Sequence, residues 1–144
     1  MKSNLSLTIA IPSLNSENHL NIAMKSILNQ KKHGFDLKIM LLDSGSTDKT
    51  KEIFFSYENK LKLSFFDLGK CSMGEARNYA INNSQCDYLI FLDSDDAILN
   101  NRLSDDFNLL KDLIYVDFIY GDSVQIVEQN LDKSYFSLSN FNPY

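Results

Sequence analysis

Short apolar runs alternate with segments of helical periodicity along most of the chain, and this alternation constrains its fold more than any other feature. Continuous apolar runs occupy residues 7–11, 37–42 and 88–92, and a partly alternating run occupies residues 61–66. Each run has the length of a strand and is separated from the next by polar, helix-capping residues. Strands that are apolar on both sides are typical of a parallel sheet covered by helices on both faces.

The segments between these strands predict helices. Apolar residues recur at helical spacing over residues 20–28, 50–57, 74–83 and 103–113. A later apolar run predicts a fifth strand over residues 115–120, with a hairpin partner at 123–127. The expected fold is therefore α/β: a mostly parallel, Rossmann-like sheet in a three-layer sandwich. Crossovers in such sheets are right-handed, so the carboxyl ends of the strands share one edge, where ligands bind.

The bulk properties of the chain are those of one globular domain. A length of 144 residues fits a single domain, which we take as residues 1–144. The formal net charge of −5 argues against nucleic acid as a partner, because neutralising phosphates requires a basic surface. No run reaches the roughly 18 apolar residues of a membrane span, which leaves only peripheral membrane association open. Two cysteines without disulfide or metal spacing predict a cytoplasmic protein.

Three carboxylates follow the most apolar strand within four positions: Asp93, Asp95 and Asp96. Like charges this close repel each other, and a bound divalent cation relieves the repulsion. Mg²⁺ and Mn²⁺ take carboxylate oxygens, and Mg²⁺ keeps positions open for substrate phosphates. The cluster therefore predicts a site for Mn²⁺ or Mg²⁺ held by one or two of these carboxylates, with a diphosphate as the other ligand.

Three other interpretations of the acidic cluster were weighed. A solvated acidic turn that caps the following helix is common in soluble proteins and stays open. A calcium loop of the EF-hand type is excluded, because its sixth and twelfth positions hold Ile98 and Ser104 instead of Gly and Glu. A phosphatase of the haloacid dehalogenase type also begins with a strand and Asp-x-Asp. Its usual Thr or Val is replaced here by Ala97, and the motif lies late in the chain.

Polar residues follow the other strand ends as well. Asp43 ends the second apolar run and can accept hydrogen bonds from a base imide or a ribose hydroxyl. Residues 46–48 are expected to cap the helix that follows, Ser46 or Thr47 through a hydroxyl and Asp48 by favouring its positive end. After the first run, Pro12 is expected to end strand pairing, and Asn15 or Ser16 can cap the helix that follows. A nucleotide contact at this segment is an equally good interpretation.

Arg77 lies near the start of the helix predicted at 74–83. Its guanidinium can reach a phosphate or a base at the same sheet edge. Pairing with Glu75 or Asp87 on the protein surface is an equally good interpretation. The sequence alone does not separate these roles.

Five segments, taken together, resemble the family-2 glycosyltransferases, which have the GT-A fold. They share the order and spacing of that family and lie at residues 9–15, 26–30, 42–50, 74–78 and 91–96. The resemblance covers nearly the whole chain. It implies an inverting enzyme that moves a sugar from a nucleotide-diphosphate donor, expected to be a UDP-sugar, to a glycan or lipid-linked acceptor. It also implies a bacterial-type protein in the cytoplasm or at the inner face of the membrane.

The resemblance further implies roles for individual residues. Asp95 would be the principal metal ligand, Asp93 would hold the ribose or the metal shell, and Asp43 would contact the base. The expected lining of the nucleotide-sugar site is Pro12, Ser13, Asn15, Glu17, Asp43, Arg77, Asp93, Ser94 and Asp95.

Two departures from the family pattern affect these expectations. Leu14 stands where many relatives carry Tyr or Phe, so stacking on the base is replaced by apolar contact. The family's general base lies well downstream of Asp-x-Asp, in the acceptor half. Asp122 and Glu128 lie too early for that role. We therefore expect a donor-binding half, truncated before the acceptor half, with the catalytic base outside this chain.

Two further expectations follow from a missing acceptor half. A non-catalytic nucleotide-sugar-binding or scaffold protein is the alternative function. Apolar surface left uncovered by the missing half would favour a homo-oligomer.

Overall fold

The computed structural model describes residues 5–30, 35–112, 117, 119, 121 and 123. Within these residues strands and helices alternate along the chain, which confirms the predicted α/β class. The bounds of the elements are β1 Leu5–Ser13, α1 Leu20–Leu28, β2 Phe35–Asp43, α2 Thr50–Phe55, β3 Lys62–Asp67, α3 Met73–Asn83, β4 Tyr88–Phe91 and α4 Arg102–Asp112. The fifth strand and hairpin predicted over residues 115–127 lie largely outside the described residues.

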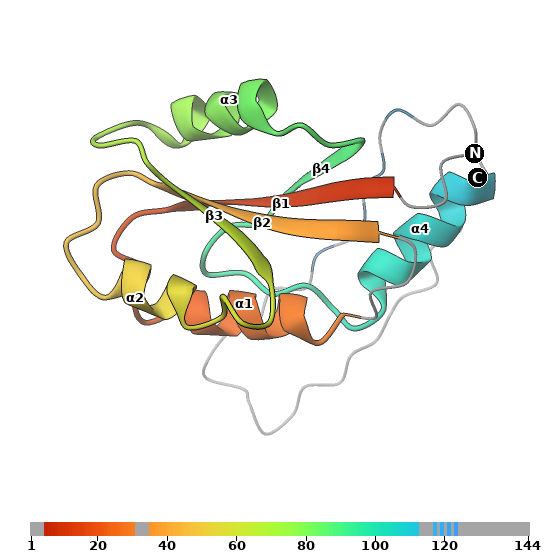
Figure 1. The fold of residues 1–144 in the computed structure, drawn as a ribbon, viewed down its shortest axis with the longest axis horizontal. Helices are drawn as coiled ribbons and strands as arrows, with labels where there is room; N and C mark the ends of the chain where they lie inside the picture. The colour runs from red at the N-terminus through yellow and green to blue at the C-terminus, as the bar shows by residue number, and fades with distance from the viewer. Residues whose placement is uncertain are drawn as a thin grey trace.

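All four strands pair in parallel, in the order β3-β2-β1-β4. Ser13 lies opposite Asp43, and Asp43 lies opposite Asp67, so β1, β2 and β3 end level with one another. The last residue of β4, Phe91, pairs with Ala10, so this strand ends earlier. The four carboxyl ends form one edge of the sheet, on the left in Figure 1.

The expectation that Pro12 ends strand pairing is wrong, because β1 continues through it to Ser13. In a parallel strand, alternate residues direct their backbone polar groups to the same neighbour. The carbonyl of Ala10 accepts from Leu92 N on the β4 side, so the backbone nitrogen of Pro12 faces that side too. Pairing with β4 stops at Ala10, and no ladder bond is lost where proline lacks its N–H.

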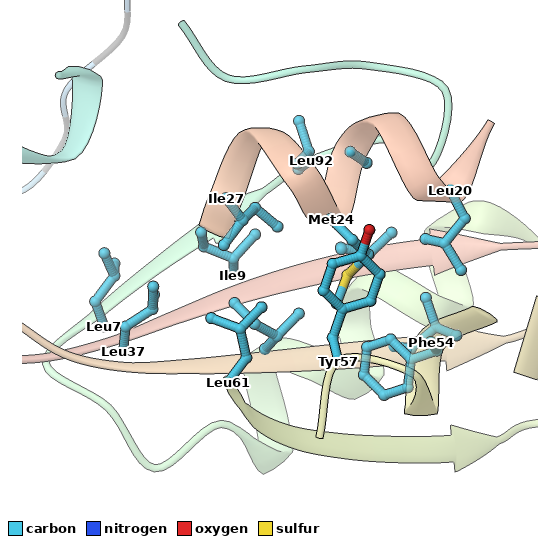
Figure 2. Close-up of a cluster of buried hydrophobic side chains, with 14 of the residues drawn as sticks. Leu7, Ile9, Leu20, Met24, Ile27, Leu37, Phe54, Tyr57, Leu61 and Leu92 are labelled. Atoms are coloured by element: carbon cyan, nitrogen blue, oxygen red, sulfur yellow. The ribbon is translucent and has the colours of Figure 1, made fainter. Parts of the chain in front are cut away.

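Helices cover both faces of the sheet, as predicted. Figure 1 shows α1 and α2 below the strands and α3 above them. Because side chains alternate along a strand, each strand contributes to both layers. The α1 and α2 side receives the larger core (Figure 2), which includes Leu7, Ile9, Ile11, Leu37, Ile39, Leu41, Leu20, Met24, Ile27 and Phe54. The α3 side receives the smaller core, formed by Ala10, Met40, Leu42, Ala76 and Ala80.

The two isoleucines of α1 provide a matched test of this core. Ile27 is 0% exposed and Ile22 is 56% exposed. Ile27→Ala should lower the free energy of unfolding by about 2–5 kcal/mol, because it removes buried methyl groups and leaves a cavity. Ile22→Ala should change it by no more than about 0.5 kcal/mol. Urea unfolding of both variants checks the difference, and equal losses would contradict the assignment of the buried face.

Candidate functional site

The loops that follow the strands meet at the carboxyl edge of the sheet. The loop after β1 begins at Leu14, the loop after β2 at Ser44, and the loop after β4 at Leu92. β1 lies between β2 and β4 in the sheet, so its loop contacts both of the others. Segments far apart in the sequence are thereby brought to one site.

Asp43 is buried at this edge, with 4% of its surface exposed. Its Oδ2 accepts hydrogen bonds from Ser46 N at 2.8 Å and Gly45 N at 3.2 Å. Gly45 adopts a φ of 89°, a left-handed conformation in which glycine is favoured, and this turn brings both N–H groups to the carboxylate. The other oxygen, Oδ1, is buried and has no hydrogen-bond partner within the part of the chain that the structure describes. A buried acceptor of this kind is suited to a donor from a ligand.

The β1 and β2 loops are joined by hydrogen bonds of Asn15. Asn15 N donates to Ser46 Oγ at 2.8 Å, and Asn15 Oδ1 accepts from Thr47 N at 2.9 Å. The residue has a φ of 49°, in the left-handed region that asparagine tolerates better than most residues. Asn15 therefore connects two loops, and neither it nor Ser46 caps a helix as the sequence suggested.

A second pair of residues joins the same two loops. Glu17 N donates to Asp48 Oδ2 at 2.9 Å, and Lys49 N donates to Glu17 Oε2 at 3.0 Å. Asp48 Oδ1 also accepts from Thr50 N at 2.9 Å. Of the three residues 46–48 expected to cap α2, Asp48 supplies the acceptor for the first N–H of that helix, whereas Ser46 bonds to the β1 loop.

The ionised form of Asp48 is stabilised by these contacts. Burial raises the pKa of Asp48, but hydrogen bonds from the Thr50 hydroxyl and from the N–H groups of Glu17 and Thr50 outweigh it. The pKa therefore lies below its ordinary value. The carboxylate carries its charge at neutral pH while it holds the two loops together.

Three serine hydroxyls connect the first strand to the acidic segment. Ser13 Oγ donates to Ser16 Oγ at 3.0 Å, and Ser16 Oγ lies 2.8 Å from Ser94 Oγ. Ser13 and Ser16 are buried, with 4% and 5% of their surfaces exposed. Ser16 N also donates to Thr50 Oγ1 at 2.7 Å, which places Ser16 between the start of α2 and Ser94. The sequence offered Ser16 only as a helix cap, and no local pattern pairs it with Ser94.

The acidic loop, which we define as residues 93–96, does not cap the helix that follows it. Asp96 N donates to Asp93 O at 3.0 Å to form a turn, and α4 begins only at Arg102. The capping interpretation of this cluster is therefore wrong. Asp95 and Asp96 are exposed, and Asp93 is half-buried.

Arg77 reaches this loop from α3. Its Nη2 donates to Asp93 Oδ1 at 2.8 Å, and its guanidinium lies 5.8 Å from the centre of the Phe91 ring. The alternative partners are engaged elsewhere: Glu75 forms a capping box with Ser72, and Asp87 accepts from Ser6. Arg77 Nε is buried without a hydrogen-bond partner in the described part of the chain, so this side chain retains an unused donor.

The site therefore contains two differently placed carboxylates for a cation. Asp93 is neutralised by Arg77, whereas no hydrogen bond or ion pair of Asp95 occurs within the described ranges. No cluster of three or more His, Cys, Asp or Glu side chains in these ranges could hold a metal by itself. The donor set fits a cation that takes one or two carboxylates and completes its shell with diphosphate and water.

The other two positions of the predicted pocket differ in exposure. Pro12 is buried within β1, next to the last residue of the strand. Leu14 is 57% exposed in the loop after β1. The structure thus brings every predicted pocket residue to the same sheet edge. Several of them, such as Asn15 and Glu17, form hydrogen bonds that join neighbouring loops.

The arrangement of a parallel sheet with acidic and polar loops at its carboxyl edge is shared with a known family. The sequence model of Glycosyl transferase family 2 matches residues 8–142. The chain belongs to this family, and its fold is the GT-A fold of the family's solved structures.

Several relatives and solved structures are similar to this chain. An uncharacterized glycosyltransferase of Haemophilus influenzae is 37% identical over 107 residues, which are 72% of this chain and 42% of that protein. TarS of Staphylococcus aureus, residues 1–349 in complex with UDP, is 28% identical with a TM-score of 0.67. That match covers 75% of this chain and 32% of the TarS chain. This chain thus spans less than half the length of these relatives.

A more distant structure shares the fold alone. Glucosyl-3-phosphoglycerate synthase from Mycobacterium tuberculosis, in complex with Mn²⁺, UDP and glucosyl-3-phosphoglycerate, is 22% identical with a TM-score of 0.56. The match covers 81% of this chain and 42% of that one. Among the described residues, no helix has the length and apolar character needed to cross a membrane.

The pH dependence of stability tests the contacts of Asp48. Asp48→Asn should lower the free energy of unfolding at pH 7 by about 1 kcal/mol, because one backbone N–H loses its acceptor. The folded pKa lies below the unfolded value, so the stabilisation is complete above about pH 4 and is lost as pH falls through the folded pKa. Urea unfolding of both proteins between pH 3 and pH 7 should therefore show a difference that shrinks with falling pH. A constant difference would contradict the assignment.

Proposed function

We propose that this chain is the donor-binding part of a glycosyltransferase that takes its sugar from a UDP-sugar. The buried, unpartnered Oδ1 of Asp43 is the observation that carries the proposal. Leaving a carboxylate oxygen desolvated without a donor is costly, and an imide N–H or a ribose hydroxyl of a nucleotide would supply one. The similarity to TarS, whose solved structures include complexes with UDP and UDP-GlcNAc, supports UDP as the nucleotide.

The remaining site residues divide between holding the pocket and binding the donor. Ser13, Asn15 and Glu17 keep the loops around the nucleotide in place through the hydrogen bonds described above. Ser94 lies beside the diphosphate, with its hydroxyl oriented by Ser16. Leu14 lies against the base through apolar contact alone.

A divalent cation fits the acidic loop in this proposal. Asp95 would provide the exposed carboxylate, and Asp93, held by Arg77, would orient the ribose or a water of the metal shell. Bound Mn²⁺ or Mg²⁺ would stabilise the negative charge that builds on the departing diphosphate. The Mn²⁺ in the mycobacterial complex supports this choice at the level of the fold.

The proposed reaction is a transfer with inversion at the anomeric carbon. An acceptor hydroxyl attacks that carbon while the bond to the diphosphate breaks, and a base outside the described residues takes the hydroxyl proton. We place the acceptor among glycans and lipid-linked sugars of the cell envelope. TarS is named for poly(ribitol-phosphate), and the relative GgaA of Bacillus subtilis is named for minor teichoic acid biosynthesis.

Asp95→Ala tests the proposed cation site. Calorimetry should show that wild-type protein binds UDP more tightly with Mn²⁺ than with EDTA. Asp95→Ala should lose this enhancement, a weakening of roughly 10- to 100-fold for one charge-assisted contact, while its affinity in EDTA stays the same. Asp96→Ala removes a neighbouring exposed carboxylate and serves as the control, with the enhancement retained. Equal enhancement in all three proteins would show that the cation binds elsewhere.

Asp43→Asn tests the proposed base contact. The amide keeps the shape of the side chain but replaces one acceptor oxygen with an NH₂ group. The imide N–H or ribose hydroxyl of the nucleotide then loses its hydrogen-bond acceptor. UDP affinity should fall by roughly 10- to 100-fold both with Mn²⁺ and with EDTA. Circular dichroism and the melting temperature report whether the variant folds. A folded variant that binds UDP normally would remove the basis of the proposal.

A further inference from the structure

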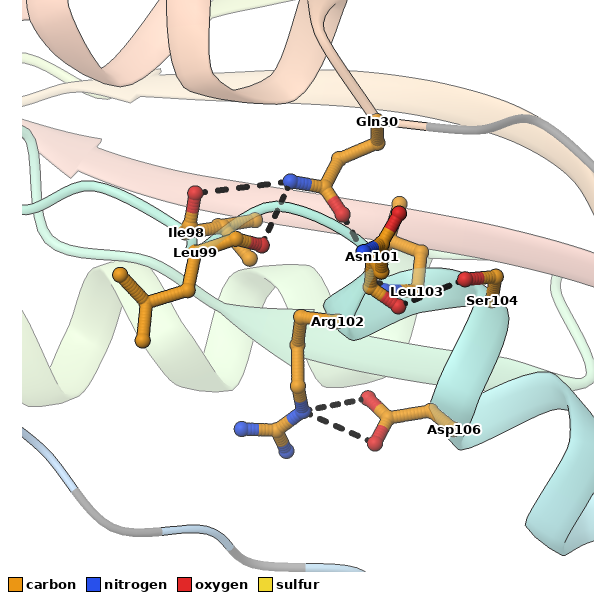
Figure 3. Close-up of polar contacts among 8 residues, drawn as sticks. All are labelled: Gln30, Ile98, Leu99, Asn101, Arg102, Leu103, Ser104 and Asp106. Carbon is orange, nitrogen blue, oxygen red and sulfur yellow. Dashed lines mark hydrogen bonds and ion pairs between the residues drawn. The ribbon is translucent and has the colours of Figure 1, made fainter. Parts of the chain in front are cut away.

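The segment that follows the acidic loop has no regular secondary structure, yet α1 holds it in place (Figure 3). Ile98 N donates to Ser26 Oγ at 3.0 Å. Gln30, just beyond the end of α1, donates from Nε2 to Leu99 O at 2.9 Å and Ile98 O at 3.4 Å. Backbone groups that neither a helix nor a strand satisfies are thus paired with side chains from another part of the chain.

The same glutamine also caps α4. Its Oε1 accepts from Leu103 N, in the first turn of that helix, at 3.2 Å. Asn101, which directly precedes the helix, has a φ of 69°, outside the extended conformation in which a residue usually caps with its own side chain. Gln30 supplies the missing acceptor from another helix, and it is 4% exposed. Its amide therefore uses both donor and acceptor atoms on residues 98–103.

The acidic loop is consequently held on both sides. Before Asp95, Asp93 pairs with Arg77 and Ser94 contacts Ser16. After it, residues 98–103 are held by Ser26 and Gln30. Asp95 itself is exposed, so its position depends on these two sets of contacts and not on packing of its own side chain.

We propose that Gln30, assisted by Ser26, is a positioning residue for the Asp95 carboxylate. This inference rests on the proposed function, in which Asp95 binds the cation of a nucleotide-sugar complex. Partners that hydrogen-bond directly to a metal ligand change metal affinity by about 10- to 100-fold when replaced. Gln30 acts on Asp95 through the backbone between residues 95 and 98, so the lower end of this range is expected. Loss of Gln30 should therefore weaken the cation-dependent part of nucleotide binding and spare the contact at Asp43, which belongs to β2.

Gln30→Met is the main variant, because methionine has a similar length but no hydrogen-bonding amide. Ser26→Ala is a second variant that releases Ile98 N independently. UDP affinity is measured by calorimetry with Mn²⁺ and with EDTA, and the ratio of the two is compared between proteins. Gln30→Met should reduce the ratio by about 10-fold, and Ser26→Ala should reduce it less, because only one bond is lost. In EDTA both variants should bind UDP as the wild type does.

Hydrogen exchange gives a readout that needs neither metal nor nucleotide. The amides of Ile98 and Leu103 should exchange faster in the Ser26→Ala and Gln30→Met proteins respectively, because each has lost its acceptor. Tyr57→Phe is the matched control for lost stability. It removes a hydrogen bond of 2.5 Å to Asn21 Oδ1 on α1, and in the described part of the chain neither residue hydrogen-bonds to residues 93–103. Its ratio of affinities should equal that of the wild type.

The outcomes separate the two proposals. Failure of wild-type protein to bind UDP would overturn the proposed function. Cation-enhanced binding that survives unchanged in folded Gln30→Met and Ser26→Ala proteins would overturn the positioning role alone. An equal loss of affinity with Mn²⁺ and with EDTA would also overturn it, since the effect would then not pass through Asp95.

Discussion

The parallel pairing of β1 with both β2 and β4 is the constraint on which the rest of the structure depends. This pairing places the loop after β1 between the end of β2, where Asp43 lies, and the acidic loop that carries Asp95. The strand is buried on both faces, so its position is set by the two hydrophobic cores and not by the polar edge. Rigid strands thus support loops whose side chains are mostly polar, which is the usual arrangement of a ligand site on an open α/β sheet.

Most polar residues at this edge form hydrogen bonds with one another. Asn15 and Glu17 accept hydrogen bonds from the β2 loop, and Ser16 links Thr50 to Ser94. Among the described residues, the atoms that remain for a ligand include the inner oxygen of Asp43, one nitrogen of Arg77 and the exposed carboxylate of Asp95. In a family 2 glycosyltransferase, the positions that match the family's motifs therefore include architectural residues as well as proposed donor contacts.

The elements of the fold could be predicted from the sequence because buried positions are apolar and recur with the period of a strand or a helix. The alternation of apolar runs gave strands and helices close to their observed bounds, and the shared edge followed from the handedness of crossovers. The errors arose where two local signals compete. Pro12 continues a strand because its missing N–H faces the unpaired side. Of the three expected capping residues 46–48, Asp48 accepts from an N–H of α2 while Ser46 bonds to Asn15. Contacts such as Ser16 with Ser94, or Gln30 with Leu103, join residues distant in sequence and leave no periodic signal.

The hydroxyl and amide bonds that join the three loops have a thermodynamic consequence. Separating only the side chains that make these bonds would expose hydroxyls, amides and carboxylates, while Leu92 at the start of the β4 loop stays in the larger core. The denaturant sensitivity of an unfolding step scales with the total surface that it exposes. The heat-capacity change of the step rises with the apolar surface that it exposes. Opening of the sheet edge would therefore depend only weakly on urea, and it would occur as a local fluctuation while the two cores stay intact. A donor as large as a nucleotide sugar could enter and leave without cost to the stability of the sheet beneath it.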